Sequence, residues 1–153
     1  MQKKVSTMGK WIMLLVLTTM TASGLSKLDA ISMIETGNND RAIGRAGEVS
    51  RYQILPEVWH QYSESIAYGN REISSTVAEK HMLYLETLFR ARTGRDATDF
   101  DLYVLWNAGA GYYERAGFAA DRVGRVIRER AQRYFNLRHV HPAQDLLYAS
   151  RLK

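Results

Sequence analysis

The residue with the clearest chemical potential in this sequence is Glu35. It follows a short apolar segment that includes Ile31 and Ile34, and it is the only acid between Asp29 and Asp40. A carboxylic acid beside apolar groups holds its proton more tightly, because its charged form loses hydration, and such a group can act as a general acid. The alternative interpretation is an ordinary solvated carboxylate at the end of a helix.

Other arrangements of reactive residues are weaker. His139 and His141 have the spacing of a metal-binding pair, but no obvious carboxylate accompanies them, so surface histidines are favoured. Tyr112 and Tyr113 either line a binding site or pack in the core, and Trp59 fits a core position best. Several arginines recur near the C-terminal end and are typical of a solvated helix face: Arg122, Arg125, Arg128, Arg130 and Arg133.

The elements that must position these residues are predominantly helical. Apolar residues at helical spacing, with Gly and Asn as stop signals, predict helices over 28–34, 56–62, 73–89, 98–106 and 118–137. Pro56 suits the first turn of the second helix, and Thr98 with Asp101 forms a capping box for the fourth. Residues 41–55 form a loop, a short strand or both. We therefore expect a mostly α single domain with at most a small strand or loop region.

Composition limits the possible chemistry further. The chain has 153 residues, of which 46% are hydrophobic and 24% charged, as in a globular domain of ordinary size. It contains no cysteine, which excludes disulfides, thiolate nucleophiles and Cys-ligated metals. We expect no cofactor and no metal.

Residues 1–24 have the layout of a secretory signal. Three lysines precede the apolar run 11–17, and small residues follow at Ala22 and Gly24. The run is shorter than the roughly 20 residues that span a bilayer, so we expect cleavage near Gly24 and a mature domain of residues 25–153 without a stable membrane span. The alternative is an uncleaved anchor or a buried first helix.

Export bears on both location and partners. Removing residues 1–24 leaves 18 basic and 16 acidic side chains, which is too weak a bias to favour nucleic acid. We expect an exported protein of the periplasm or cell envelope that does not bind nucleic acid.

Three short blocks, and more loosely a fourth segment, resemble the soluble lytic transglycosylase, or goose-type lysozyme-like, domain. Residues 34–38, Ile-Glu-Thr-Gly-Asn, resemble its Glu-Ser step, and residues 47–56 resemble its Gly-Leu-Met-Gln-Ile-x-Pro block. Residues 105–109, Leu-Trp-Asn-Ala-Gly, are similar to its Ala-Tyr-Asn-Ala-Gly block, and residues 131–137 resemble its closing helix. The resemblance covers roughly residues 28–137, and it implies a lysozyme-like fold with a substrate cleft.

The resemblance implies a role for each matching residue. Glu35 matches the catalytic acid and base, Gln53 matches a side chain of the saccharide cleft, and Asn107 matches a hydrogen-bonding partner of substrate or catalytic Glu. Tyr52 replaces the usual Met and Trp106 the usual Tyr, and both would offer flat walls to a sugar ring.

The chain also departs from the family pattern. Thr36 stands where Ser is common, and Ser50 and Arg51 stand where Gly and Leu are common. Arg130 falls near the position where an aromatic residue of the closing helix is expected. These differences indicate a divergent branch.

Glu48 is a second acid that the family pattern does not require. One hypothesis places its carboxylate in the cleft, where it orients the partners of Glu35 or positions a water molecule. The other makes it a surface acid paired with Arg45 or Arg51.

The activity implied by the resemblance is cleavage of the β-1,4 bond between N-acetylmuramic acid and N-acetylglucosamine in peptidoglycan, with formation of a 1,6-anhydro ring. The partner would be a peptidoglycan glycan strand. The alternatives are a lysozyme-type hydrolase, in which water attacks, and an inactive peptidoglycan-binding scaffold.

Overall fold

The computed structural model describes residues 24–139, so the predicted leader lies outside it apart from Gly24. Within this range the regular structure is helical, as predicted. Two isolated β-bridges, Ile43 with Val49 and Val49 with Ile54, are the only β pairing between residues 24 and 139. No helix in that range is long and apolar enough to cross a membrane. The helical segments are α1 (Lys27–Thr36), α2 (Pro56–Trp59), α3 (Arg71–Thr93), α4 (Asp99–Ala108), α5 (Ala110–Arg115), a 3-10 turn (Ala120–Arg122) and α6 (Arg125–His139).

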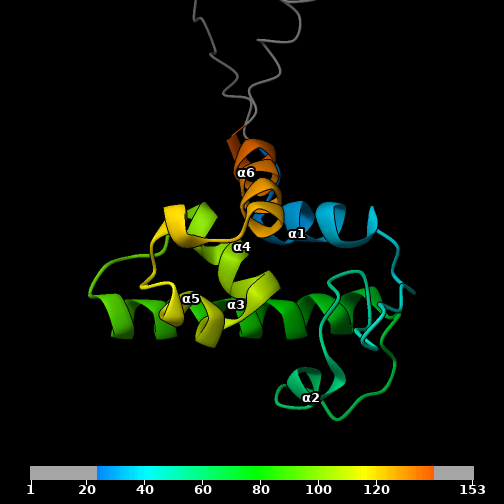
Figure 1. Ribbon diagram of the computed structural model, residues 1–153. Coiled ribbons are helices and arrows are strands. Elements are labelled where there is room, and N and C mark those ends of the chain that lie inside the picture. Colours follow the sequence, from blue (N-terminus) through cyan, green and yellow to red (C-terminus); the bar gives the residue numbers. More distant parts are fainter. Residues whose placement is uncertain (1–23, 140–153) are drawn as a thin grey trace, which may run out of the picture.

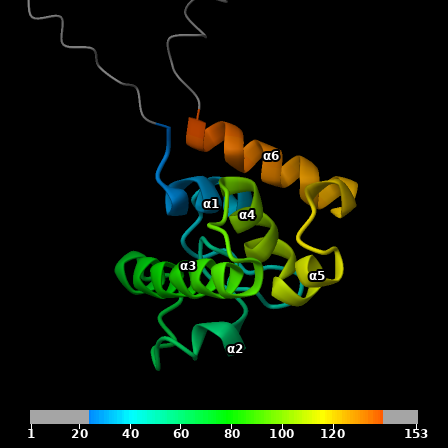
Figure 2. The same ribbon diagram turned by 90° about the vertical axis from the view of Figure 1, so that its left-hand side faces the viewer.

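Helix α4 forms the centre of the fold. Its residues Leu102–Leu105 are buried, and it contacts α3, α5 and α6. Helix α1 lies beside it and contacts both α3 and α6. Figure 2 shows the resulting order, with α6 on one side of α1 and α4, and α3 followed by α2 on the other. The C-terminal ends of α1 and α4, which carry Glu35, Trp106 and Asn107, are thus held between longer helices.

Local sequence signals set the helix ends that position these residues. The Ser26 side chain accepts a hydrogen bond from the Asp29 N–H at 3.1 Å and caps the start of α1. Gly37, with a φ of 62°, ends α1 in the left-handed conformation that glycine adopts most easily. The expected capping box of Thr98 and Asp101 starts α4. In Figure 1 the long helix α3 runs past both α1 and α4.

The structure differs from the predicted helices at three places. Helix α2 ends at Trp59 instead of reaching residue 62. Helix α4 ends at Ala108, as the stop signal at Gly109 predicts, but a short helix that was not predicted, α5, follows directly. The last helix starts at Arg125 instead of residue 118, where Phe118 and the preceding Gly117 have left-handed backbones. Val126 in its first turn is 64% exposed.

The largest fully buried side chains are aromatic, and one carboxylate is buried among them. Trp59 is fully buried, as expected for a core residue. The Asp101 carboxylate accepts hydrogen bonds from the Tyr113 hydroxyl at 2.6 Å and from Arg95 at 2.7 Å. Burial by itself would raise the pKa of the Asp101 carboxyl, but hydrogen bonds from Arg95, Tyr113 and Thr98 outweigh it and hold the pKa below its usual value. This cluster fixes the start of α4.

Candidate active site

Glu35 lies in the last turn of α1 with its side chain only 7% exposed. The Tyr103 hydroxyl, which comes from α4, donates a hydrogen bond of 2.6 Å to its Oε1. The Arg130 guanidinium of α6 lies 3.5 Å from its Oε2. Side chains from three helices therefore meet at this carboxylate: a hydroxyl contacts Oε1 and a guanidinium lies near Oε2.

The Tyr103 phenol keeps its proton and donates it in a hydrogen bond to the Glu35 carboxylate. Burial raises its pKa far above the ordinary value, and the adjacent Glu35 carboxylate adds to the effect. The phenol therefore stays protonated at any physiological pH. Because its hydrogen bond fixes Oε1, it leaves Oε2 as the oxygen that can exchange a proton with a ligand.

A cavity of about 340 Å³ opens beside Glu35. Its lining brings together the end of α1, the 41–55 loop, the end of α4 and one residue of α6. The lining residues are Glu35, Arg45, Glu48, Gln53, Trp106, Asn107 and Arg130. Predicted site residues that lie far apart in sequence thus share one cavity, together with two arginines that were not predicted there.

A second, smaller cavity of about 130 Å³ continues the first. Glu48, Gln53, Trp106 and Asn107 line both, so these four residues connect the two spaces. The remaining walls of the smaller cavity are mostly apolar: Ile54, Leu55, Val58 and His81. Together the cavities offer a carboxylic acid at one end, two amides and an indole in the middle, and an apolar wall at the other end.

The 41–55 loop holds Glu48 and Gln53 by backbone geometry. The paired bridges around Val49 fold the loop back on itself, and Gln53 has a left-handed φ of 52°. The Glu48 carboxylate accepts a hydrogen bond of 2.9 Å from the Ala46 N–H, and the Gln53 side-chain amide donates one of 3.2 Å to the Ser50 carbonyl. A Cβ at Gly44 would lie 2.2 Å from Glu48 Oε2 and 2.4 Å from Gln53 Oε1. A larger residue at this position would therefore displace the ends of both side chains.

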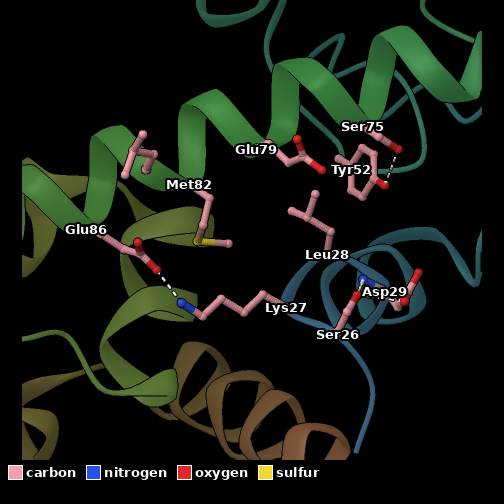
Figure 3. A pocket seen from close by; sticks show the side chains of 10 residues that line it. Ser26, Lys27, Leu28, Asp29, Tyr52, Ser75, Glu79, Met82 and Glu86 are labelled. Atoms are coloured by element: carbon pink, nitrogen blue, oxygen red, sulfur yellow. Dashed lines mark hydrogen bonds and ion pairs between the residues drawn. The ribbon is translucent and has the colours of Figure 1, made fainter.

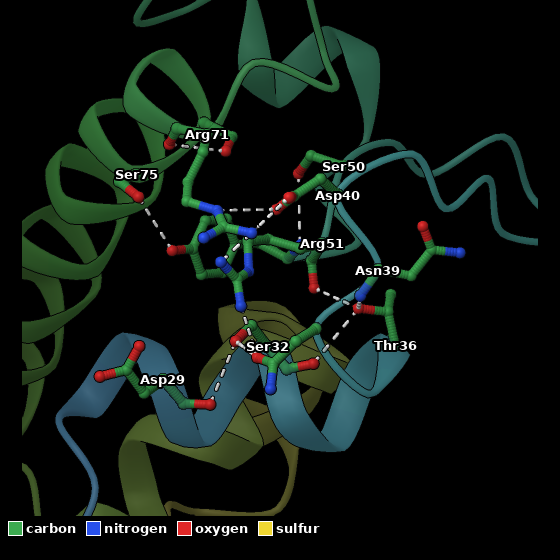
Figure 4. Close-up of polar contacts among 12 residues, drawn as sticks. Asp29, Ser32, Thr36, Asn39, Asp40, Ser50, Arg51, Arg71 and Ser75 are labelled. Carbon is green, nitrogen blue, oxygen red and sulfur yellow. Dashed lines mark hydrogen bonds and ion pairs between the residues drawn. The ribbon is translucent and has the colours of Figure 1, made fainter.

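A polar cluster ties this loop to the end of α1. The Thr36 hydroxyl donates a hydrogen bond of 3.0 Å to the Arg51 carbonyl, so the threonine that replaces the usual serine still links the two segments. The Arg51 guanidinium donates to Asn38 at 2.5 Å and lies 3.4 Å from Asp40, which also accepts from Arg71 at 2.7 Å (Figure 4). The hydrogen bond from Arg71 holds the pKa of Asp40 below its usual value. Arg51 therefore turns away from the cavity.

The two hypotheses for Glu48 can be compared with its position. Its side chain lines both cavities, and no ion pair joins it to Arg45 or Arg51 in the part of the chain that the structure describes. Arg51 pairs with Asp40 instead, whereas Arg45 lines the same cavity. This location agrees with the first hypothesis, a carboxylate in the cleft.

Trp106 and His81 form an aromatic corner of the smaller cavity. The Trp106 indole N–H donates to the Tyr52 carbonyl at 3.2 Å, and the His81 ring lies 5.2 Å from it, edge to face. His81 Nδ1 also lies 3.2 Å from the Tyr62 hydroxyl. Burial lowers the pKa of His81, so its imidazole is neutral near pH 7. The corner presents flat, uncharged faces of the kind that suit a sugar ring.

Tyr52 is the predicted site residue that the structure does not bring into this site. Its side chain is buried, and its hydroxyl lies 3.0 Å from the Ser75 hydroxyl of α3. It lines a different cavity, of about 490 Å³, between α1 and α3 (Figure 3). The left-handed backbones of Ser50 and Gln53 on either side of it turn the ring inward. Only its carbonyl serves the site, as the acceptor for Trp106.

The other candidates have structural roles. His139 lies 2.8 Å from the Asp99 carboxylate, whereas His141 lies outside the described residues. Tyr113 is buried and its hydroxyl donates a hydrogen bond to Asp101, and the Tyr112 hydroxyl accepts a hydrogen bond from the Gly124 N–H. Residues 24–139 contain no cluster of His, Asp and Glu able to hold a metal ion.

Besides the two arginines, Tyr103 and His81 are residues at the site that the sequence did not identify. Tyr103, Trp106 and Asn107 recur at intervals of three and four residues, so the helical spacing puts them on one face. The helical spacing alone therefore indicates that Tyr103 lies on the same face as the two site residues of this helix. No local signal marks His81, because α3 reaches the site only through tertiary packing.

Three comparisons with known proteins gave no match for this chain. No family model, no curated protein and no solved structure matches it.

Proposed function

We propose that this protein cleaves the β-1,4 bond between N-acetylmuramic acid and N-acetylglucosamine in peptidoglycan as a lytic transglycosylase. The observation that carries the proposal is the cavity in which a nearly buried Glu35 faces two side-chain amides and an indole. Amides suit the hydroxyl and acetamido edges of a sugar, and the indole suits its apolar face. The resemblance of the three sequence blocks supplies the identity of the substrate.

One carboxyl group suffices for this reaction. Glu35, protonated on Oε2, donates its proton to the glycosidic oxygen as the bond to C1 breaks and an oxocarbenium-like charge develops. The oxygen of the substrate's own N-acetyl group stabilises C1. The C6 hydroxyl then attacks C1 and gives its proton back to the Glu35 carboxylate. The product is a 1,6-anhydro ring, and no water is consumed.

Gln53, Asn107 and Trp106 would hold the sugar on both sides of the cleaved bond. They line the space that joins the two cavities, which places them around a saccharide next to Glu35. Tyr103 would act through Glu35, because its hydroxyl fixes one carboxylate oxygen and directs the other into the cavity.

Hydrolysis is the second candidate activity, and Glu48 is the observation that favours it. Its carboxylate lines the same cavity as Glu35, where it could activate a water molecule. A Glu48→Gln variant tests this role directly. Full retention of activity would exclude a catalytic part for Glu48, whereas loss of hydrated products alone would assign it to the water.

The test of the proposed function is mass spectrometry of the products formed from purified peptidoglycan by residues 25–153. Glu35→Gln removes the acid, and Glu64→Gln, at an exposed position, is the matched control. Muropeptides that lack one water, made by the control but not by Glu35→Gln, support a lytic transglycosylase. Hydrated reducing ends with the same dependence indicate a lysozyme. Folded protein that binds glycan strands without a Glu35-dependent product indicates the inactive scaffold.

The proposed setting is the periplasm or cell envelope, where peptidoglycan is found. It depends on the predicted leader of residues 1–24. Detection of mature protein that begins near residue 25 in an envelope fraction tests it.

A further inference from the structure

Two guanidinium groups reach the Glu35 cavity from different parts of the chain. Arg45 comes from the 41–55 loop and Arg130 from α6. Neither side chain makes a hydrogen bond within residues 24–139, and the only ion pair that either forms there is the 3.5 Å approach of Arg130 to Glu35. Their planar N–H groups are therefore available to a ligand, and this donor geometry matches a carboxylate.

Arg130 differs from the other arginines around it. Its side chain is only 35% exposed, whereas Arg128 and Arg133 are exposed, and Arg125 pairs with Glu129 on the outside of α6. The solvated-face interpretation thus fits its neighbours and fails for Arg130.

We propose that Arg45 and Arg130 bind a carboxylate that the muramic acid residue of the substrate carries on its lactyl arm. This inference rests on the proposed function and names the part of the substrate that the arginines recognise. The glycan backbone offers only hydroxyl and acetamido groups. The anionic groups of peptidoglycan are the free lactyl carboxylate, or the carboxylates of the peptide attached to it.

The charges in the cavity support this assignment. Glu35 and Glu48 face Arg45 and Arg130, so the formal charges of these four residues balance. Glu35 already accepts a hydrogen bond from Tyr103, and Glu48 accepts one from the Ala46 N–H. The two acids therefore have partners other than the arginines, and both guanidinium groups can bind a ligand anion.

The geometry at Glu35 supports the same assignment. Tyr103 donates to Oε1, and Oε2 faces Arg130. A guanidinium has no acceptor, so it cannot receive a hydrogen bond from an Oε2 that carries the catalytic proton. A substrate carboxylate, which accepts hydrogen bonds only, is then the better partner for Arg130.

The binding test uses disaccharides that lack the cleaved bond and are therefore not turned over. The arginine Nε–Hε signals of the folded protein are followed by NMR during addition of three probes. Chitobiose carries no carboxylate, GlcNAc–MurNAc carries the lactyl carboxylate, and GlcNAc–MurNAc-tripeptide carries only the peptide carboxylates. We expect the Arg45 and Arg130 signals to shift with a carboxylate-bearing probe and not with chitobiose, and the two acidic probes distinguish the sources. Equal shifts with chitobiose, or no shift with any probe, would overturn the proposal.

The kinetic test compares Arg45→Gln with Arg41→Gln, an exposed arginine of the same loop that does not line the cavity. The measured quantity is the ratio of kcat/KM on peptidoglycan strands to that on the same strands with their carboxylates converted to amides. We expect Arg45→Gln to lower this ratio about threefold, as for the loss of an exposed ion pair, and Arg41→Gln to keep it. An unchanged ratio in Arg45→Gln argues against the carboxylate site while leaving the proposed function intact. Absence of Glu35-dependent products from either substrate removes the proposed function, and the NMR titration then decides on the carboxylate site alone.

Discussion

Removal of the Tyr103 hydroxyl is the sharpest perturbation that the structure offers. In Tyr103→Phe the ring keeps its packing against Tyr134, at 5.5 Å between centroids, and only the 2.6 Å hydrogen bond to Glu35 is lost. A hydrogen bond to a charged group contributes about 1.5–3 kcal/mol. If that energy holds Glu35 in its reactive position, kcat should fall by about 10- to 150-fold, since about 1.4 kcal/mol corresponds to a factor of ten.

The kinetic signature separates positioning from substrate binding. Tyr103 is fully buried and does not line the cavity, so its hydroxyl acts through Glu35 and not on the sugar. We therefore expect KM to stay near the wild-type value while kcat falls. The assay is the initial rate of anhydromuropeptide release, measured by chromatography at several concentrations of soluble glycan strands.

Tyr113→Phe is the matched control. Its hydroxyl also donates a 2.6 Å hydrogen bond to a buried carboxylate, that of Asp101, but neither residue lines the cavity. Both variants should lose thermal stability, and only Tyr103→Phe should lose kcat. Wild-type kcat in Tyr103→Phe, or an equal loss in both variants, would refute the assigned role of Tyr103.

Three further perturbations follow from the same structure. Gly44→Ala places a Cβ against the ends of the Glu48 and Gln53 side chains. It should reduce kcat by about tenfold or more while the thermal unfolding midpoint changes little. A fully active variant would show that the positions of these two side chains do not matter for turnover. Burial lowers the pKa of His81 in the folded protein. Its neutral form therefore contributes stability in full above the unfolded pKa of about 6.5, and this contribution is lost as the pH falls below that value. The free energy of unfolding, measured by denaturant titration at pH 5 and 7.5, should depend less on pH in His81→Gln than in the wild type. Thr98→Ala removes the capping box of α4 and should cost about 1 kcal/mol, seen in urea unfolding, with Thr76→Ala on the exposed face of α3 as the reference variant.

Local signals predicted the helix ends that carry the site. Gly37 and Gly109, which end α1 and α4, act through contacts with residues at most five positions away, so the sequence alone specifies them. The end of α1 therefore presents Glu35, and the end of α4 presents Trp106 and Asn107, as expected. Where the helix ends are set locally, the residues next to them could be located in advance.

Contacts between distant segments could not be predicted in this way. Tyr103 lies 68 residues from Glu35, and their hydrogen bond depends on how α1 and α4 pack. Tyr52 and Gln53 are neighbours in sequence, but the left-handed backbones at Ser50 and Gln53 send one side chain into the core and the other into the cavity. Pattern analysis treats such neighbours alike, because it does not include the conformation of an irregular loop.

Arg51 and Arg130 illustrate how partners decide the role of a charge. Arg51 is two residues before Gln53 in sequence, yet Asn38 and Asp40 hold its guanidinium away from the cavity, so its charge stabilises the loop. Arg130 belongs to the last helix, yet its guanidinium faces the acid. An aromatic residue was expected near Arg130, and the Tyr103 phenol on α4 supplies an aromatic hydroxyl to Glu35 from another direction. With Glu35 already held by Tyr103, a cation at Arg130 is not required to position the acid, and it remains available to bind the anionic part of a substrate.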